Sequence, residues 1–182
     1  MKLRNSPHRF GLVANLLHWV IVAGIITQYF LAEAAEDNDA SASALTGMGL
    51  HRSIGFTILV LAVARLAWRM FDAPPAWPNT MKPLARTLAS TTHIAFYVLL
   101  FALPLSGWAV SSAEGDPLSM FGLFSFPPLT FGEAMEDTFE EVHEILFNVL
   151  IALGLLHILA ALKHQFIDRD GVLRRMLPGS SE

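Results

Sequence analysis

Residues 140–164 read EEVHEILFNVLIALGLLHILAALKH, and no charged residue lies between Glu144 and Lys163. A helix of about 20 apolar residues crosses the roughly 30 Å hydrocarbon core of a membrane. Three further stretches have the same character, at residues 12–31, 54–71 and 94–110, and only Arg65 and Arg69 interrupt the second. Helices of a soluble bundle would each carry a polar face, which these stretches lack. The sequence predicts an all-α integral membrane four-helix bundle with helices at about 10–31, 51–71, 84–110 and 140–165, in a single domain 1–182.

The composition restricts the chemistry that the chain can perform. Hydrophobic residues make up 53% of the 182 residues, and there is no cysteine. The lack of cysteine excludes disulfides, thiolate-bound iron–sulfur clusters and covalent haem attachment through a Cys-x-x-Cys-His motif. A metal centre would therefore use histidine, methionine or oxygen ligands, and the chain has seven histidines. We expect membrane lipid as the surroundings, and no nucleic-acid partner.

The charged residues predict an orientation. Basic residues gather on one side of the predicted membrane, at Lys2, Arg4, Arg9, Lys82, Arg86, Lys163, Arg169, Arg174 and Arg175. The positive-inside rule then places both termini and the connection between the second and third helices in the cytoplasm. The two outer connections are acidic and contain Glu33, Glu36, Asp37, Asp39, Glu114, Asp116, Glu133, Glu136, Asp137, Glu140 and Glu141. Arg52 is the one basic residue expected on that outer side.

Four histidines fall into two pairs of matched depth. His18 and His157 lie about six residues inside the cytoplasmic ends of the first and fourth helices, whereas His51 and His143 begin the second and fourth helices at the outer side. His143 and His157 share one helical face within about 40° and lie about 21 Å apart. A single buried histidine is more often a hydrogen-bonded core residue, but unpaired imidazoles in membrane helices are costly. Two depth-matched pairs favour axial ligation of two haems.

Other polar residues near these levels suggest further roles. Arg65 shares a helical face with His51, and a haem propionate would compensate its charge; Arg69 would be a second clamp. Both arginines could instead extend to lipid headgroups. His93 and His164 lack partners of matched depth, so they could hydrogen-bond a quinone or carry its protons, or serve as interfacial polar residues.

Short motifs in a fixed order resemble those of the bacterial cytochrome b561 family, the small four-helix di-haem b membrane cytochromes. They are LHW at 17–19, HRSIG at 51–55, HIAFY at 93–97, ALPLSG at 102–107, HE at 143–144, LH at 156–157, KH at 163–164 and LRRMLP at 173–178. The resemblance implies His18 and His157 as ligands of a cytoplasmic-side haem, and His51 and His143 as ligands of an outer haem. It also implies a location in the bacterial inner membrane and a quinone contact at His164.

The sequence thus predicts a cytochrome that transfers electrons between the quinone pool (ubiquinone or another quinone) and a small redox donor, acceptor or redox protein at the periplasmic face. A member of the family is a superoxide oxidase, which makes superoxide oxidation one candidate activity. An acidic outer face disfavours it, because an anion is steered by positive potential. Two alternatives remain: a His-lined divalent-metal transporter, and a haem b membrane-anchor subunit of a larger redox enzyme. No catalytic nucleophile or acid–base pair is predicted.

Overall fold

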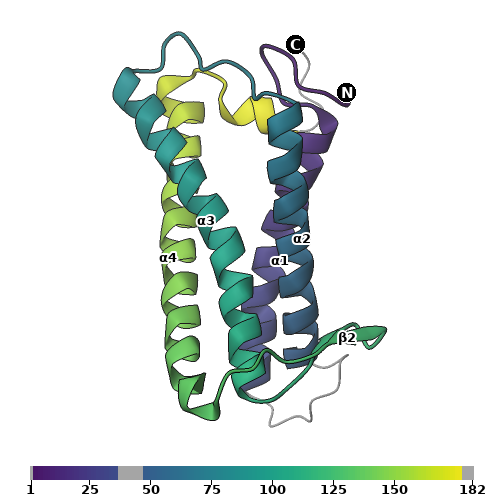
Figure 1. Ribbon diagram of the computed structural model, residues 1–182. Coiled ribbons are helices and arrows are strands. Elements are labelled where there is room, and N and C mark those ends of the chain that lie inside the picture. Colours follow the sequence, from purple (N-terminus) through teal and green to yellow (C-terminus); the bar gives the residue numbers. More distant parts are fainter. Residues whose placement is uncertain (1, 37–46, 178–182) are drawn as a thin grey trace.

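The computed structural model describes residues 2–36 and 47–177, and these form an up-and-down bundle of four long helices (Figure 1). The helices are α1 (Leu12–Glu36), α2 (Gly47–Phe71), α3 (Pro83–Ala113) and α4 (Glu136–Lys163). All four contain windows long and apolar enough to cross a membrane. The predicted all-α, membrane-type four-helix bundle is therefore confirmed.

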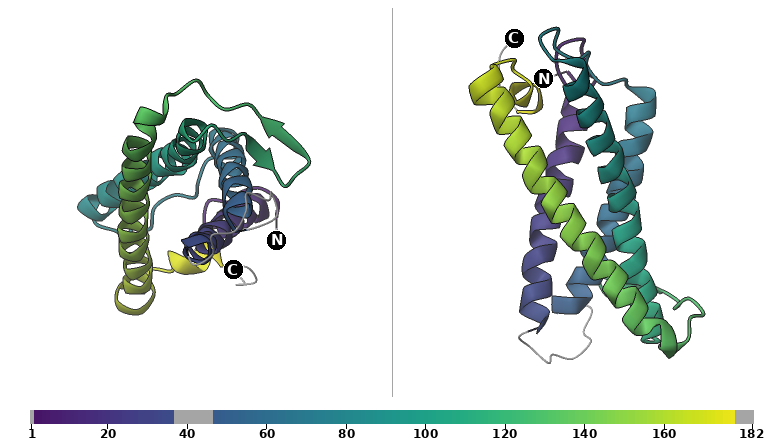
Figure 2. Two further views of the ribbon diagram at one scale, coloured as in Figure 1. Left: turned by 90° about the horizontal axis from the view of Figure 1, so that it is seen from below. Right: turned by 90° about the vertical axis from the view of Figure 1, so that its left-hand side faces the viewer.

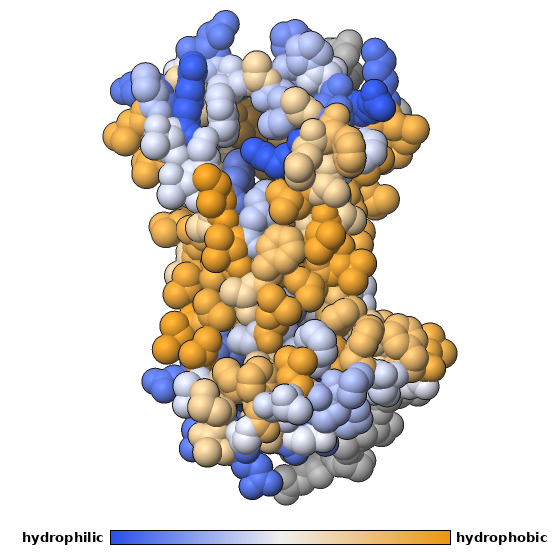
Figure 3. All heavy atoms as spheres, in the orientation of Figure 1, coloured by the Kyte–Doolittle hydropathy of each residue, from blue (hydrophilic) through white to orange (hydrophobic). Residues whose placement is uncertain are grey.

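The two ends of the bundle differ. The first and last described residues lie at one end, called here the termini end, together with the connection between α2 and α3 (Figure 1). The opposite, hairpin end carries the connection between α3 and α4, which includes the antiparallel strands β1 (Leu118–Met120) and β2 (Phe124–Phe126). A space-filling view shows polar residues at both ends and an apolar belt between them (Figure 3). This distribution is the one expected of helices that cross a bilayer.

The helices pack in sequence order. α1 packs against α2, α2 against α3, and α3 against α4, whereas α4 makes no comparable contact with α1 or α2 among the described residues. Two further views show α4 inclined across the bundle (Figure 2), and Tyr29 of α1 stacks on Phe147 of α4 with ring centroids 6.4 Å apart. The buried apolar core lies where the first three helices meet, and consists of Ile21, Ile58, Ala62 and Leu100. α4 is therefore attached to the rest of the bundle chiefly through α3.

The helices extend beyond the predicted bounds. α1 continues to Glu36, α2 begins at Gly47, and α4 begins at Glu136 after the short 3-10 helix η1 (Glu133–Met135). Hydropathy marks only the part of a helix within hydrocarbon, and the backbone stays helical into the polar layer. After α4 the chain forms a π-helical turn, η2 (His164–Asp168), and a 3-10 turn, η3 (Leu173–Met176). The predicted outer-loop acids Asp37 and Asp39 lie outside the described residues.

Candidate functional site

At the hairpin end, the structure brings His51 of α2 and His143 of α4 together. Their ring centroids are 6.3 Å apart, although α2 and α4 do not pack against each other. Two metal–nitrogen bonds of about 2 Å, with roughly 1 Å from each nitrogen to its ring centre, would give about 6 Å. The spacing of the two rings thus matches a metal bound between them.

The surroundings of His143 orient its ring. Ser106 Oγ of α3 lies 2.9 Å from His143 Nδ1 and also donates a hydrogen bond of 2.8 Å to the carbonyl oxygen of Leu103. A hydroxyl has one proton, so Ser106 Oγ accepts the proton of Nδ1–H, and the lone pair of Nε2 remains available. Ligating histidines commonly donate their second nitrogen in this way. A β-carbon at Gly107 would lie 3.0 Å from His143 Cε1, so the glycine allows the ring to sit against α3.

His51 has fewer hydrogen bonds to its ring than His143 has. Its Nδ1 is buried and has no hydrogen-bond partner. Its carbonyl oxygen accepts a hydrogen bond of 2.9 Å from Gln28 Nε2 of α1, which ties the first turns of α2 to α1. A buried ring nitrogen without a partner is costly, so this atom does not itself argue for ligation; the position of the ring opposite His143 is what would allow its other nitrogen, Nε2, to bind a metal.

At the termini end, three histidines lie near one level. The ring of His157 is 5.8 Å from that of His93 and 5.3 Å from that of Phe96. His18 lies close enough to both His157 and His93 for electrostatic interaction, and its Nδ1 is buried without a partner. The structure therefore brings the predicted pair His18 and His157 to one region, and adds His93 of α3 to it.

Arg65 lies beside these histidines. Its guanidinium carbon is 5.9 Å from the centre of the Tyr97 ring, and it interacts electrostatically with His18 and His157. Ion pairs among the described residues do not include Arg65 or Arg69. Arg65 is half-buried and Arg69 is exposed. A half-buried arginine without a carboxylate partner is a suitable place for an anionic group of a cofactor.

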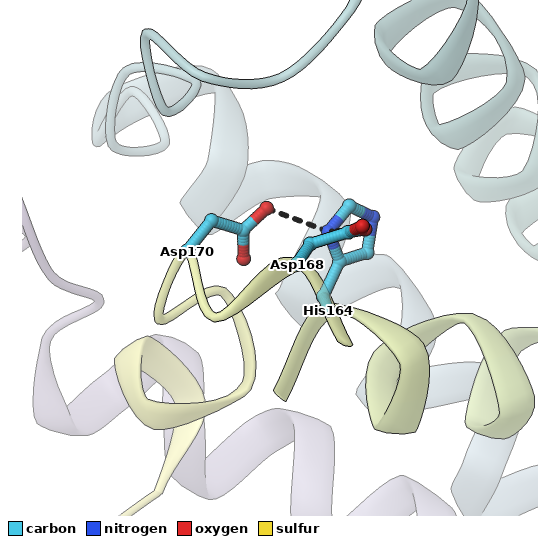
Figure 4. Close-up of side chains that lie close together, drawn as sticks. All are labelled: His164, Asp168 and Asp170. Carbon is cyan, nitrogen blue, oxygen red and sulfur yellow. Dashed lines mark hydrogen bonds and ion pairs between the residues drawn. The ribbon is translucent and has the colours of Figure 1, made fainter. Parts of the chain in front are cut away.

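His164 belongs to a cluster that the sequence analysis did not predict (Figure 4). Its Nδ1 lies 2.6 Å from Asp170 Oδ2 and 3.2 Å from Asp168 Oδ2, and the Asp170 side chain is only 3% exposed. Lys163 Nζ pairs with Asp168 at 2.5 Å. His164, Asp168 and Asp170 each offer one ligand atom and together could hold a metal ion. Asp170 already accepts a hydrogen bond from His164. The signal in the sequence is the HQFIDRD spacing at 164–170.

The single basic residue predicted for the outer side is neutralised. Arg52 donates to Glu114 Oε2 at 2.6 Å and to Asp116 Oδ2 at 2.7 Å. Burial raises the pKa of the Glu114 carboxyl, and nearby carboxylates add to this, although Arg52 opposes the shift. Carboxylates thus dominate the charge at the hairpin end.

Comparison with known proteins identifies the family of this chain. The profile of the prokaryotic cytochrome b561 family matches residues 9–179. The chain belongs to this family. Cytochrome b561 homolog 2 of Escherichia coli (strain K12) is 35% identical and covers 100% of this chain and 97% of its own length. The probable superoxide oxidase CybB of Yersinia pestis is 30% identical, over 89% of this chain and 92% of its own. Cytochrome b561 homolog 1 of Escherichia coli is 29% identical, over 94% and 98%.

The cytochrome b561 protein is accordingly a multi-pass bacterial membrane cytochrome, and the family implies haem b as cofactor. The residues present fit that group. The rings of His51 and His143 lie 6.3 Å apart, and the ring of His143 is fixed by Ser106 with Nε2 available for a metal. Which histidines hold haem, and how many haems there are, stay predictions.

Proposed function

We propose that this cytochrome b561 protein binds two haem b groups and transfers electrons through the bilayer, between a quinone at the termini end and a redox partner at the hairpin end. The observation that supports this best is the pair His51 and His143, 6.3 Å apart on helices that do not pack together. Each bound haem would supply a one-electron iron couple. The protein supplies axial nitrogens, a low-dielectric environment and fixed spacing.

The second haem is assigned to His18 and His157 rather than to His93 and His157. α3 and α4 pack directly against each other, so the His93–His157 contact joins neighbouring helices. A porphyrin is a wide plate, and ligands on its two faces must come from helices that leave room between them. α1 and α4 pack far less closely than α3 and α4, although Tyr29 of α1 stacks on Phe147 of α4 nearer the hairpin end; α2 and α4 are likewise loosely packed for the other pair. His93 would then border the haem, and Arg65 would pair with a propionate, with Arg69 as a second clamp.

The quinone is assigned to the termini end. Quinone reduction consumes protons as well as electrons, and His164 holds a hydrogen bond to Asp170 there, with Lys163 and Asp168 adjacent. Because Nδ1 of His164 is engaged by carboxylates, its Nε2 is the nitrogen able to contact a quinone oxygen. His93 is the second candidate for that contact. We propose that this end faces the cytoplasm from a bacterial inner membrane, because its basic residues agree with the positive-inside rule.

The redox partner at the hairpin end is proposed to be neutral or cationic. Its relative in Yersinia pestis is named a probable superoxide oxidase, but superoxide is an anion. Here Arg52 is paired with two carboxylates, and the surrounding loop and the start of α4 are acidic. Superoxide oxidation by this chain therefore stays a candidate that the local charge disfavours.

The other candidate functions have less support. A divalent-metal transporter would need carboxylates among its intramembrane histidines. In the described part of the chain, His164 alone among the histidines forms an ion pair with carboxylates. A haem b anchor subunit of a larger enzyme would use the same haem sites, so the ligand test below applies to it as well.

The ligand assignment is tested by haem quantification in purified variants. His18→Ala and His51→Ala should each lose about one haem of two, because each removes one axial nitrogen of a different site. His93→Ala is the matched control at the termini end and should retain both haems. Loss of one haem from His93→Ala but none from His18→Ala would show that His93 of α3, and not His18, is the axial ligand. Retention of both haems in all three variants would refute the whole ligand assignment.

A further inference from the structure

The connection between α3 and α4 contains an apolar hairpin that the cytochrome function does not explain. Residues 117–131 include no charged residue, although acidic residues flank them on both sides. β1 and β2 pair with Leu118 opposite Phe126 and Met120 opposite Phe124. A short exposed hairpin in water would normally carry polar residues at its turn and outer positions.

The base of the hairpin is fixed to α2 and α3. Leu118 and Met120 are 3% and 7% exposed, and the Phe126 ring packs at 5.1 Å from Phe56 of α2 and 6.1 Å from Trp108 of α3. Ser53 of α2 connects to β1 and the residue after it: its Oγ accepts from Phe121 N–H at 3.0 Å, and its single proton is shared between the carbonyl oxygens of Ser119 at 2.9 Å and Gly49 of its own helix at 2.8 Å. The base therefore has a defined position on the bundle.

The tip of the hairpin is exposed and apolar. Leu123 is 82% exposed, Phe124 55% and Phe121 37%. Phe121 has a φ of 52°, in the left-handed region where a turn in water usually carries Asn, Asp or Gly. A phenylalanine is strained at that position, so its use indicates that an apolar side chain is needed there. The tip projects sideways from the bundle (Figures 1 and 2).

The height of the hairpin points to lipid as the occupant. If the middle of each helix lies at the bilayer midplane, Ser53 is six residues from the middle of α2 and Trp108 ten residues from the middle of α3, or about 9 Å and 15 Å. The hydrocarbon core extends about 15 Å from its midplane. The hairpin thus leaves the bundle between the outer part of the hydrocarbon and its edge, and its apolar surface continues the apolar belt of the helices (Figure 3).

We propose that the hairpin tip, Phe121, Leu123 and Phe124, inserts into the interfacial region of the leaflet at the hairpin end and anchors that end of the bundle at a fixed depth. The insertion is shallow, because unpaired strand edges are not tolerated in the hydrocarbon interior. Ser53 lies two residues after His51, so the anchor acts on the helical turn that carries a proposed haem ligand. A second copy of the chain is the other occupant that could cover the tip, and the test distinguishes the two.

Site-directed spin labelling tests the proposal directly, because the chain has no cysteine. Leu123→Cys and, separately, Phe124→Cys are introduced into the full-length, haem-loaded protein, labelled with a nitroxide, and reconstituted into phosphatidylcholine–phosphatidylglycerol vesicles. Glu140→Cys, at an exposed acidic position on α4 at the same end, is the control. Collision rates are measured with oxygen, which concentrates in lipid, and with a water-soluble nickel chelate.

The expected result is a several-fold higher ratio of oxygen to nickel collisions at 123 and 124 than at 140. Ratios at 123 and 124 equal to that at 140 would place the tip in water and overturn the proposal. Shielding from both reagents, with spectral broadening that increases with protein-to-lipid ratio, would show a second copy on the tip and would overturn it as well. The haem spectrum of each labelled protein confirms that the bundle is intact. Two positions are labelled separately, so that the test can still be made if one of the two variants does not fold.

Discussion

Removal of the Ser106 hydroxyl should change the redox potential of one haem and leave the other unchanged. Ser106 Oγ lies 2.9 Å from His143 Nδ1 and accepts its proton, because the Ser106 hydroxyl itself donates to Leu103 O. Ferric iron carries one more positive charge than ferrous iron and polarises the imidazole N–H more strongly. The hydrogen bond is therefore stronger in the oxidised state, and Ser106→Ala should raise the midpoint potential of the haem bound to His143.

The size of the shift follows from the hydrogen-bond energy. A neutral hydrogen bond contributes about 0.5–1.5 kcal/mol net, and only the part that differs between the two oxidation states affects the potential. For a one-electron couple, about 59 mV corresponds to a tenfold change in the equilibrium constant, or about 1.4 kcal/mol. A difference of roughly 0.5 kcal/mol gives about 20 mV, and the full bond sets an upper limit of about 60 mV.

A spectroelectrochemical titration of the purified protein measures the two potentials as two components. Ser112→Ala is the matched control, because Ser112 lies on the same helix, is buried, and donates only to Trp108 O of its own helix at 2.7 Å. That variant should leave both potentials unchanged. A shift of both components by the same amount, a downward shift, or no shift in Ser106→Ala would refute the assigned role of the hydroxyl.

Further tests address the neighbouring groups. Gly107→Ala should displace the His143 ring, because its β-carbon would lie 3.0 Å from the ring, and haem content should fall toward one per protein. Gly132→Ala, at an exposed position of the same end where an added β-carbon meets nothing within 4 Å, should retain both haems. Arg65→Gln should lower the potential of one haem in a redox titration, since it removes a half-buried positive charge, whereas Arg69→Gln, at an exposed position, should change it little. If superoxide reduces the protein, the rate of haem reduction measured by stopped flow should rise as salt is added, because salt screens the repulsion between the anion and the acidic hairpin end. A rate that falls with added salt would contradict the charge argument.

The helices and the levels of the histidines could be predicted from the sequence because both depend on local periodicity. Hydropathy fixes where each span begins and ends to within a few residues, and 1.5 Å per residue converts position into depth. On that basis His51 and His143 were expected at one level, and the structure places their rings 6.3 Å apart. Their ligation of haem stays a prediction, as does that of His18 and His157.

The contacts that orient these rings could not be predicted, because they depend on how the helices cross. The position of Ser106 and Gly107 against His143 follows from the packing of α3 on α4, and no spacing in either helix specifies it. The approach of His93 to His157 arises from the same pair of helices.

The carboxylates at His164 depend on a change in backbone geometry. A π-helical turn and the left-handed Arg169, with φ of 53°, reverse the chain so that Asp170 reaches His164. The β-hairpin could not be predicted either, because an uncharged run of this length between turns has no clear hydrophobic periodicity.

The position of α4 connects the fold to the proposed function. This helix carries both His143 and His157, yet among the described residues it packs chiefly against α3, and it meets α1 and α2 through single ring contacts, Tyr29 with Phe147 and His51 with His143. A four-helix bundle that buried its core by side chains alone would bring the fourth helix into extensive contact with the first. Here α1 and α2, which pack against each other, carry His18 and His51, and α4 carries His143 and His157. A ligand that binds only the folded state stabilises it by mass action. Haem bound between α4 and the α1–α2 pair would therefore complete the bundle as well as carry its electrons.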